Sequence, residues 1–240
     1  MSVEILPIVE QQDEQIRIVG YEEREKIHRE GLRHVTSLVL PVFAQNRRKV
    51  LTLDKFNKAR KKAQLRGMPA PQRKPQIDVF GGHVTQQELR LKDRSEGILS
   101  GETMRRSALK ELSEELFLVS DSKLYAYPVD ASKLYELGWF AYEGCGNNEL
   151  GFAFLYMLDG YPDNDRFMGA DCVLSAESGV EEISLDTNIY TIMELLKKNR
   201  LENESVQSYE ICDGLKRLLD EQDTLLPLLE KTLCIPIRLT

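Results

Sequence analysis

The segment at residues 101–119, GETMRRSALKELSEELFLV, most constrains what this chain can fold into. Its apolar residues recur at the three- and four-residue spacing of one helix face: Ala108, Leu109, Leu112 and Leu116. Glu111, Glu114 and Glu115 lie on the other side, where each like-charged pair weakens an isolated helix by roughly 0.2–0.5 kcal/mol. Such a face is either an ordinary solvated acidic surface or a place where carboxylate oxygens hold a hard cation such as Mg²⁺.

Composition sets the background for this helix. The chain has 240 residues, of which 42% are hydrophobic, enough for a sizeable core in one domain with or without a small appendage. No apolar run approaches the roughly 18–20 residues that span a bilayer, and the N-terminal stretch is acidic, unlike a signal peptide. We therefore expect a globular cytoplasmic protein that does not contact membranes. The four cysteines are far apart in sequence and predict neither a zinc cage nor a disulfide framework.

The rest of the chain reads as alternating strands and helices. Before the helix, the pattern predicts strands at 4–10 and 15–20, a helix at 21–31 closed by Gly31, a hairpin of strands at 34–45 and 49–56, and a strand at 75–80. Residues 84–100 read as an insertion that serves as a flap or as a subunit contact. After the helix we expect at least two strands within 123–158, a loop or short extended excursion at 159–179, a strand, an N-cap at Asp186, an amphipathic helix, and two further helices near 207–219 and 223–233.

The glutamates follow a recognisable spacing. Lys110-Glu111-Leu112-x-Glu114-Glu115, with Glu102 eight positions before Lys110, resembles the Nudix box, G-x5-E-x7-R-E-U-x-E-E-x-G-U, in which U is aliphatic. Lys110 stands where the family has Arg, and it keeps the charge but lacks the bidentate fork. Phe117 stands where the family has Gly, so the turn after the helix must be built differently. The leading Gly of the box is identified as Gly82, which places an insertion of fourteen residues before Glu102.

The resemblance implies an α/β fold, the Nudix α/β/α sandwich with a mixed sheet between two helices. It covers roughly residues 4–199. We expect a Nudix domain at 1–199, with N-terminal strands and the insertion at 84–100, and a helical extension at 200–240 packed on it.

The three histidines of the chain all precede the glutamate-rich helix: His28, His34 and His83. Their surroundings, REKIHREGLRHV and FGGHV, resemble the isopentenyl-diphosphate-isomerase-like subgroup of Nudix proteins, in which such histidines and downstream glutamates bind a metal. Here they are either ligands or structural groups that form hydrogen bonds around a helix-to-strand turn. Glu149 occupies the place of an acidic residue that faces the metal. Gly81 replaces the cysteine of the isomerases, so we do not expect isomerase activity.

The resemblance implies hydrolysis of a diphosphate linkage in a nucleoside-diphosphate-type substrate, with Mg²⁺ or Mn²⁺ as cofactor. The implied catalytic residues are Glu111, Glu114, Glu115 and Lys110, and the implied metal ligands are these three glutamates with Glu102, His83 and Glu149. Either a carboxylate of the box or Glu149 is the general base. The alternative is a Nudix-fold sensor that binds a nucleotide-like ligand without turnover, which the departures at Lys110 and Phe117 favour.

Residues 47–74 hold eleven basic residues and one acid, a local charge of +10 that leaves −17 for the rest of a chain whose net charge is −7. The segment either contacts an anionic ligand or is a solvated loop. The candidate substrate-binding residues are Lys55 and Arg60 in this segment, with Gly81 and Gly82, where the backbone can approach a ligand closely. We expect a small phosphorylated partner rather than nucleic acid, because no nucleic-acid module is visible. Homodimers are common in the family that the chain resembles.

Overall fold

The structure, a computed structural model, describes residues 3–44, 46–54, 69, 76–120, 123–144, 147–159, 166–169, 185–188, 210–218 and 225–234. The substrate-binding candidates Lys55 and Arg60, and the amphipathic helix expected after Asp186, lie outside the described residues. No helix in the described part of the chain is long and apolar enough to cross a membrane.

The N-terminal hairpin and the helix after it are confirmed, although residues 21–23, predicted as helix, belong to the second strand. Strands β1 (Ile5–Gln12) and β2 (Gln15–Glu23) form an antiparallel hairpin, and helix α1 (Arg24–Glu30) follows. Gly31 ends the helix with φ 64° and ψ 30°, the left-handed conformation that glycine adopts without a Cβ penalty. The helix therefore stops abruptly and the chain enters the central sheet within three residues.

Strand β3 (His34–Phe43) lies at the centre of a mixed sheet. It pairs antiparallel with β4 (Asn46–Asp54) and β6 (Phe80–His83), and parallel with β10 (Asn147–Leu158). All but one of its residues are buried, including the apolar run Val39–Phe43 and the polar residues His34, Thr36 and Ser37. The other strands of this sheet are β5 (Gln76–Asp78), β9 (Leu134–Gly144), β12 (Leu185–Asn188) and β13 (Glu210–Ile211), together with β1 and β2.

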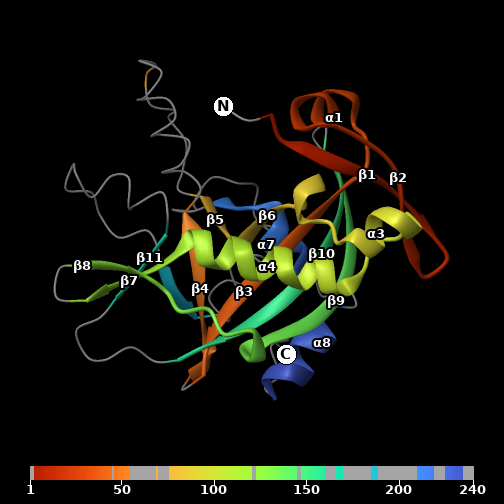
Figure 1. The fold of residues 1–240 in the computed structure, drawn as a ribbon. Coiled ribbons are helices and arrows are strands. Elements are labelled where there is room, and N and C mark those ends of the chain that lie inside the picture. Colours follow the sequence, from red (N-terminus) through yellow and green to blue (C-terminus); the bar gives the residue numbers. More distant parts are fainter. Residues whose placement is uncertain are drawn as a thin grey trace.

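Helices cover both faces of this sheet (Figure 1). Helix α4 (Gly101–Glu115) lies over one face, and its N-cap Ser100 Oγ accepts a hydrogen bond from Thr103 N. On the other side, α7 (Asp213–Leu218) approaches Leu38 of β3, and α8 (Leu225–Leu233) packs against β9. The α/β class with a mixed sheet between helices is thus confirmed. A smaller antiparallel sheet contains β7 (Leu116–Ser120), β8 (Lys123–Ala126) and β11 (Arg166–Gly169).

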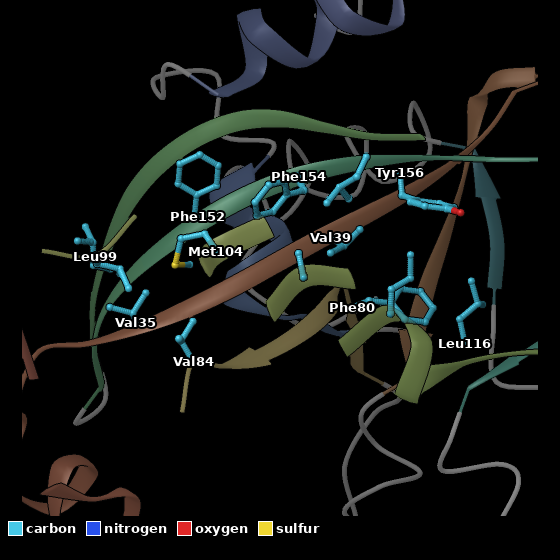
Figure 2. Close-up of a cluster of buried hydrophobic side chains, with 14 of the residues drawn as sticks. Val35, Val39, Phe80, Val84, Leu99, Met104, Leu116, Phe152, Phe154 and Tyr156 are labelled. Carbon is cyan, nitrogen blue, oxygen red and sulfur yellow. The ribbon is translucent and has the colours of Figure 1, made fainter. Parts of the chain in front are cut away.

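The main core lies between α4 and the sheet (Figure 2). Met104 and Leu112 of α4 are fully buried against Val39 of β3, Phe80 of β6 and Phe154 of β10. Because strand residues alternate between faces, Val35, Ser37 and Val39 point toward α4. The bond from Ser37 Oγ to Ser107 Oγ of α4 fixes the same assignment.

The helix is shorter than its apolar periodicity predicts. It ends at Glu115, and Leu116 is extended, with φ −105° and ψ 122°, where β7 begins. Leu116 is buried as expected, but it reaches the core from a strand. Phe-Leu-Val favours a strand, and no glycine follows to form a left-handed cap, so the chain passes directly from helix to strand.

The insertion packs on the N-terminal hairpin of the same chain. After helix α3 (Leu91–Glu96), Ile18 N donates to Gly97 O at 2.8 Å and Leu99 N donates to Ile16 O at 2.8 Å. Its buried Asp93 accepts a hydrogen bond from Thr103 Oγ1 of α4. The segment is therefore held against β2 and against the start of α4.

Two predictions near the C-terminus need correction. Asp186 lies within β12, opposite Leu51 of β4, and so does not cap a helix. The helix expected at 207–219 begins only at Asp213, because Glu210–Ile211 pairs with β5 as strand β13. The last predicted helix is confirmed as α8.

Gly81→Ala is expected to destabilise the protein. Gly81 has φ +143°, and a Cβ there would lie 2.1 Å from the backbone oxygen of Ser37. A non-glycine residue in that conformation costs on the order of 1–3 kcal/mol before the clash is counted. Urea denaturation would measure the loss. Gly101→Ala is the matched control, because a Cβ there meets nothing within 4 Å, and equal stability of the two variants would contradict this reading.

Candidate functional site

Helix α4 places two carboxylates against the backbone of β6. A Cβ at residue 82 would lie 2.5 Å from Glu111 Oε2, so the absence of a side chain at Gly82 makes room for that carboxylate. Glu115 Oε2 accepts a hydrogen bond from Gly81 N at 3.2 Å. The two adjacent glycines therefore meet two members of the predicted glutamate cluster.

Lys110 lies among three carboxylates. Its Nζ is 3.1 Å from Glu114 Oε2, 3.4 Å from Glu111 Oε1 and 3.5 Å from Glu88 Oε1. Burial works against the charged form of Lys110, but the three carboxylates outweigh it and raise its pKa. Part of the repulsion expected between the glutamates is therefore relieved by a cation of the protein itself.

Glu88 holds the position that the sequence analysis assigned to Glu102. The Glu88 side chain is 10% exposed and pairs with Lys110, whereas that of Glu102 is 60% exposed and pairs with Arg90. Glu102 and Glu111 are nine residues apart, about 13 Å along the helix axis. The sequence does contain a signal for Glu88, because five residues separate it from Gly82, as in the motif, with no insertion between them. The fourteen extra residues then fall between Glu88 and Lys110.

Glu88 is held in place by its own loop. Its Oε2 accepts hydrogen bonds from Thr85 N at 2.7 Å and from Thr85 Oγ1 at 2.9 Å. Its Oε1 is directed to Lys110. Glu88 thus connects the loop after β6 to the cation that lies beside Glu111.

The Glu111 carboxylate is costly to ionise in this setting. Burial raises its pKa, the two nearby carboxylates add to the effect, and Lys110 offsets only part of it. A carboxylate that remains destabilised when ionised gains from a further cation. A divalent ion beside Glu111 would offset the free-energy cost of ionising this buried carboxylate.

A second cluster contains all three histidines. His28 comes from the last turn of α1, His34 from the first residue of β3, and His83 from the last residue of β6. Their candidate ligand nitrogens all lie within 4.8 Å of one another. The His34 and His83 rings are stacked with centroids 5.0 Å apart, and His28 meets both edge-on.

His34 uses its two nitrogens differently. Nδ1 lies 3.0 Å from Leu32 O, and because a carbonyl can only accept, Nδ1 is the donor. In neutral His34 the lone pair is then on Nε2, which is buried without a hydrogen-bond partner among the described residues. Glu149 Oε1 is 3.7 Å from Nε2, too long for a hydrogen bond. One nitrogen of His34 therefore stabilises the turn, and the other has no hydrogen-bond partner among the described residues.

Asn148 stabilises the turn between His28 and His34, a role that the sequence did not suggest. Its Nδ2 donates to Gly31 O at 3.3 Å, and its Oδ1 accepts from Arg33 Nε at 2.8 Å. Glu149, the next residue of β10, pairs with His34 in the parallel register. Strand β10 therefore holds both the turn and the carboxylate closest to the cluster.

The histidine and glutamate clusters lie on opposite faces of β6. Gly82 meets Glu111 of α4, and His83, the next residue, points to the other side because strand residues alternate. His34 and Glu149 likewise belong to the face away from α4. The predicted metal ligands therefore form two sets. The predicted glutamates of α4 form one set, and His83 with Glu149 forms the other. The backbone between Gly82 and His83 connects the two sets.

Glu88→Gln is expected to destabilise the protein more than Glu102→Gln. Neutralising Glu88 removes a buried partner of Lys110 and should cost about 1–3 kcal/mol. The exposed Glu102 pair should contribute less than about 1 kcal/mol. Urea denaturation of both variants checks the ranking, and a larger loss for Glu102→Gln would restore Glu102 as the partner of this site.

Glu111→Gln is expected to stabilise the metal-free protein at pH 7. The raised pKa of Glu111 means that the folded state binds its proton more tightly than the unfolded chain. The free energy of unfolding then falls as the pH rises from 4.5, the ordinary pKa, through the folded value. Urea denaturation with EDTA across pH 4–8 should show a weaker decline for the variant. Lower stability than wild type at every pH would contradict this.

Comparison with known proteins gives limited information. No protein family profile matches the chain, and no curated protein matches it. Among solved structures, Tm1382, described as a candidate Nudix hydrolase, is 14% identical over 75% of this chain and 91% of its own, with a TM-score of 0.36. A MutT/nudix family protein from Enterococcus faecalis is 11% identical over 81% of this chain and 66% of its own, with a TM-score of 0.34. Similarity of this extent does not establish a shared family.

Proposed function

We propose that the protein is a Nudix-type hydrolase that cleaves a diphosphate linkage in a nucleoside-diphosphate-type substrate with a divalent metal ion. The observation that carries this proposal is the contact of Glu111 and Glu115 with the Gly81–Gly82 backbone. It brings two carboxylates of the motif against the backbone of β6.

The donor sets fit divalent ions of two kinds. Glu111, Glu114 and Glu115 offer only carboxylate oxygens, which suit Mg²⁺ or Mn²⁺. The raised pKa of Glu111, which burial causes, supports this fit because a nearby cation would favour the ionised carboxylate. His28, His34 and His83 with Glu149 offer imidazole and carboxylate, which suit Mn²⁺ or Zn²⁺ better than Mg²⁺. The orphaned Nε2 of His34 supports a ligand there.

The bound ions would neutralise the charge of the diphosphate and lower the pKa of water. Lys110 and Glu88 keep the Glu111 and Glu114 carboxylates in place, because the Lys110 ammonium lies between the three. Hydrolysis forms a bond from a water oxygen to phosphorus and breaks the phosphorus–oxygen bond of the anhydride. A carboxylate of α4 or Glu149 takes the proton that the water loses. Lys55 and Arg60 are proposed to bind the phosphates.

Isomerase activity is not proposed, and the geometry of Gly81 supports its exclusion. A Cβ at this position would lie 2.1 Å from Ser37 O and 3.0 Å from Leu38 Cα. A cysteine therefore does not fit here without movement of the backbone.

A ligand sensor is the second candidate, and the position of Lys110 favours it. Its ammonium already pairs with Glu88, Glu111 and Glu114. An internal cation in this place reduces the electrostatic gain from a metal ion. Such a protein would bind a nucleotide without cleaving it.

Glu115→Gln is expected to lower turnover by about 100-fold or more while the fold stays intact, because the amide cannot replace a carboxylate as ligand or base. The assay is release of phosphate and pyrophosphate from nucleotide sugars, dinucleoside polyphosphates, NADH, ADP-ribose, nucleoside triphosphates and isoprenyl diphosphates. It is run with Mg²⁺, with Mn²⁺ and with EDTA.

Glu96→Gln is the matched control, since Glu96 is an exposed glutamate of α3 that pairs with Lys92. It should turn over substrate like wild type. Undiminished turnover in Glu115→Gln would refute the proposed role of that residue. No turnover by folded wild-type protein, combined with nucleotide binding, would favour the sensor.

A further inference from the structure

Two polar atoms on one face of β3 are buried without a hydrogen-bond partner among the described residues. They are Nε2 of His34 and Oγ1 of Thr36, in residues that are 0% and 4% exposed. A buried hydroxyl without a partner costs free energy, so in most proteins such groups are satisfied by the protein or by an ordered ligand.

The strand pairing places Thr36 beside the histidine cluster. Thr36 lies directly opposite His83 in the antiparallel pairing of β3 with β6, and opposed residues share a face. His34 is two residues earlier on β3 and therefore lies on that face as well. In the parallel pairing with β10, Glu149 stands beside His34 and Gly151 beside Thr36.

Neighbouring polar residues behave differently. Ser37, the next residue, points to the other face and donates to Ser107 Oγ of α4 at 3.2 Å. Thr52 of β4 is equally buried and has an interaction partner within the protein. Of the three buried residues Thr36, Ser37 and Thr52, only Thr36 has a hydroxyl without a partner among the described residues. Thr36 lies on the face that carries His34 and His83.

We propose that the Thr36 hydroxyl belongs to the histidine-cluster site and forms a hydrogen bond with an oxygen ligand of the metal bound there. That oxygen belongs either to a metal-bound water, which donates to the Thr36 hydroxyl, or to a phosphate group, which accepts from it. The inference rests on the metal site of the proposed function. Thr36 acts here as a positioning residue, because it orients the ligand while the histidines hold the ion.

The test compares Thr36→Val with Thr52→Val, two isosteric changes of buried threonines. Calorimetric titration with Mn²⁺ and with Co²⁺, and the visible absorption of bound Co²⁺, report the metal site directly. A second titration adds inorganic pyrophosphate to the metal-loaded protein. His28→Asn identifies which part of the binding belongs to the histidine cluster, and urea denaturation of the metal-free variants reports stability.

Thr36→Val should leave the metal-free protein as stable as wild type or more so, since it removes an unsatisfied group. Binding should weaken by roughly five- to tenfold, the value of one hydrogen bond. If the metal affinity falls, the partner is a water; if only the pyrophosphate affinity falls, it is a phosphate oxygen. Thr52→Val should show the reverse, with lower stability and unchanged binding. Thr36→Ser should bind like wild type.

Unchanged binding of both metal and pyrophosphate in Thr36→Val would overturn the role of Thr36 and leave the metal site standing. A marked loss of metal-free stability in that variant would show that the hydroxyl is satisfied within the protein, and would also overturn it. If the His28→Asn variant binds metal as tightly as the wild-type protein does, the histidine site itself is refuted.

Discussion

The close contact between α4 and the two glycines of β6 is the interaction on which the rest of this structure depends. Gly81 requires a positive φ, and Gly82 leaves room for the Glu111 carboxylate. A Cβ at Gly81 would clash with the backbone of Ser37 and Leu38 on β3, and a Cβ at Gly82 would displace the Glu111 carboxylate. The same contact joins the apolar core, in which Phe80 packs beside Leu112, to the polar edge where Glu111 and Glu115 meet the backbone. Packing and candidate chemistry are therefore set by one pair of elements.

The electrostatics of the helix explain why a lysine is tolerated at position 110. Three carboxylates surround its Nζ at 3.1–3.5 Å, so a point charge satisfies them without the planar fork of arginine. Glu88 is the most buried of the three, and Thr85 fixes its other oxygen. The long connection after Glu88 does not disturb this arrangement, because it packs on β2 and returns to the start of α4 through Asp93 and Thr103.

The histidine cluster is built by the N-terminal part of the fold. Gly31 ends α1 so abruptly that His28 and His34 lie close together, and β6 brings His83 to the same cluster. Asn148 holds the turn from the neighbouring strand. The two candidate metal sets share the β6 backbone but lie on opposite faces, which suits them to ions of different preference.

Local sequence patterns were enough to predict most of the helices and strands and to suggest candidate ligands. Periodicity located α4, glycine located the end of α1, and the spacing of the glutamates named the candidate ligands, because each of these depends on residues close together in the chain. Local pattern failed at Leu116 and Asp186, where strand pairing prevailed over helix signals. Only the tertiary structure decided that Glu88 rather than Glu102 meets Lys110, and that the histidines form a separate cluster with Thr36 beside it. These relations depend on contacts between distant segments, and strand register and helix docking fix such contacts.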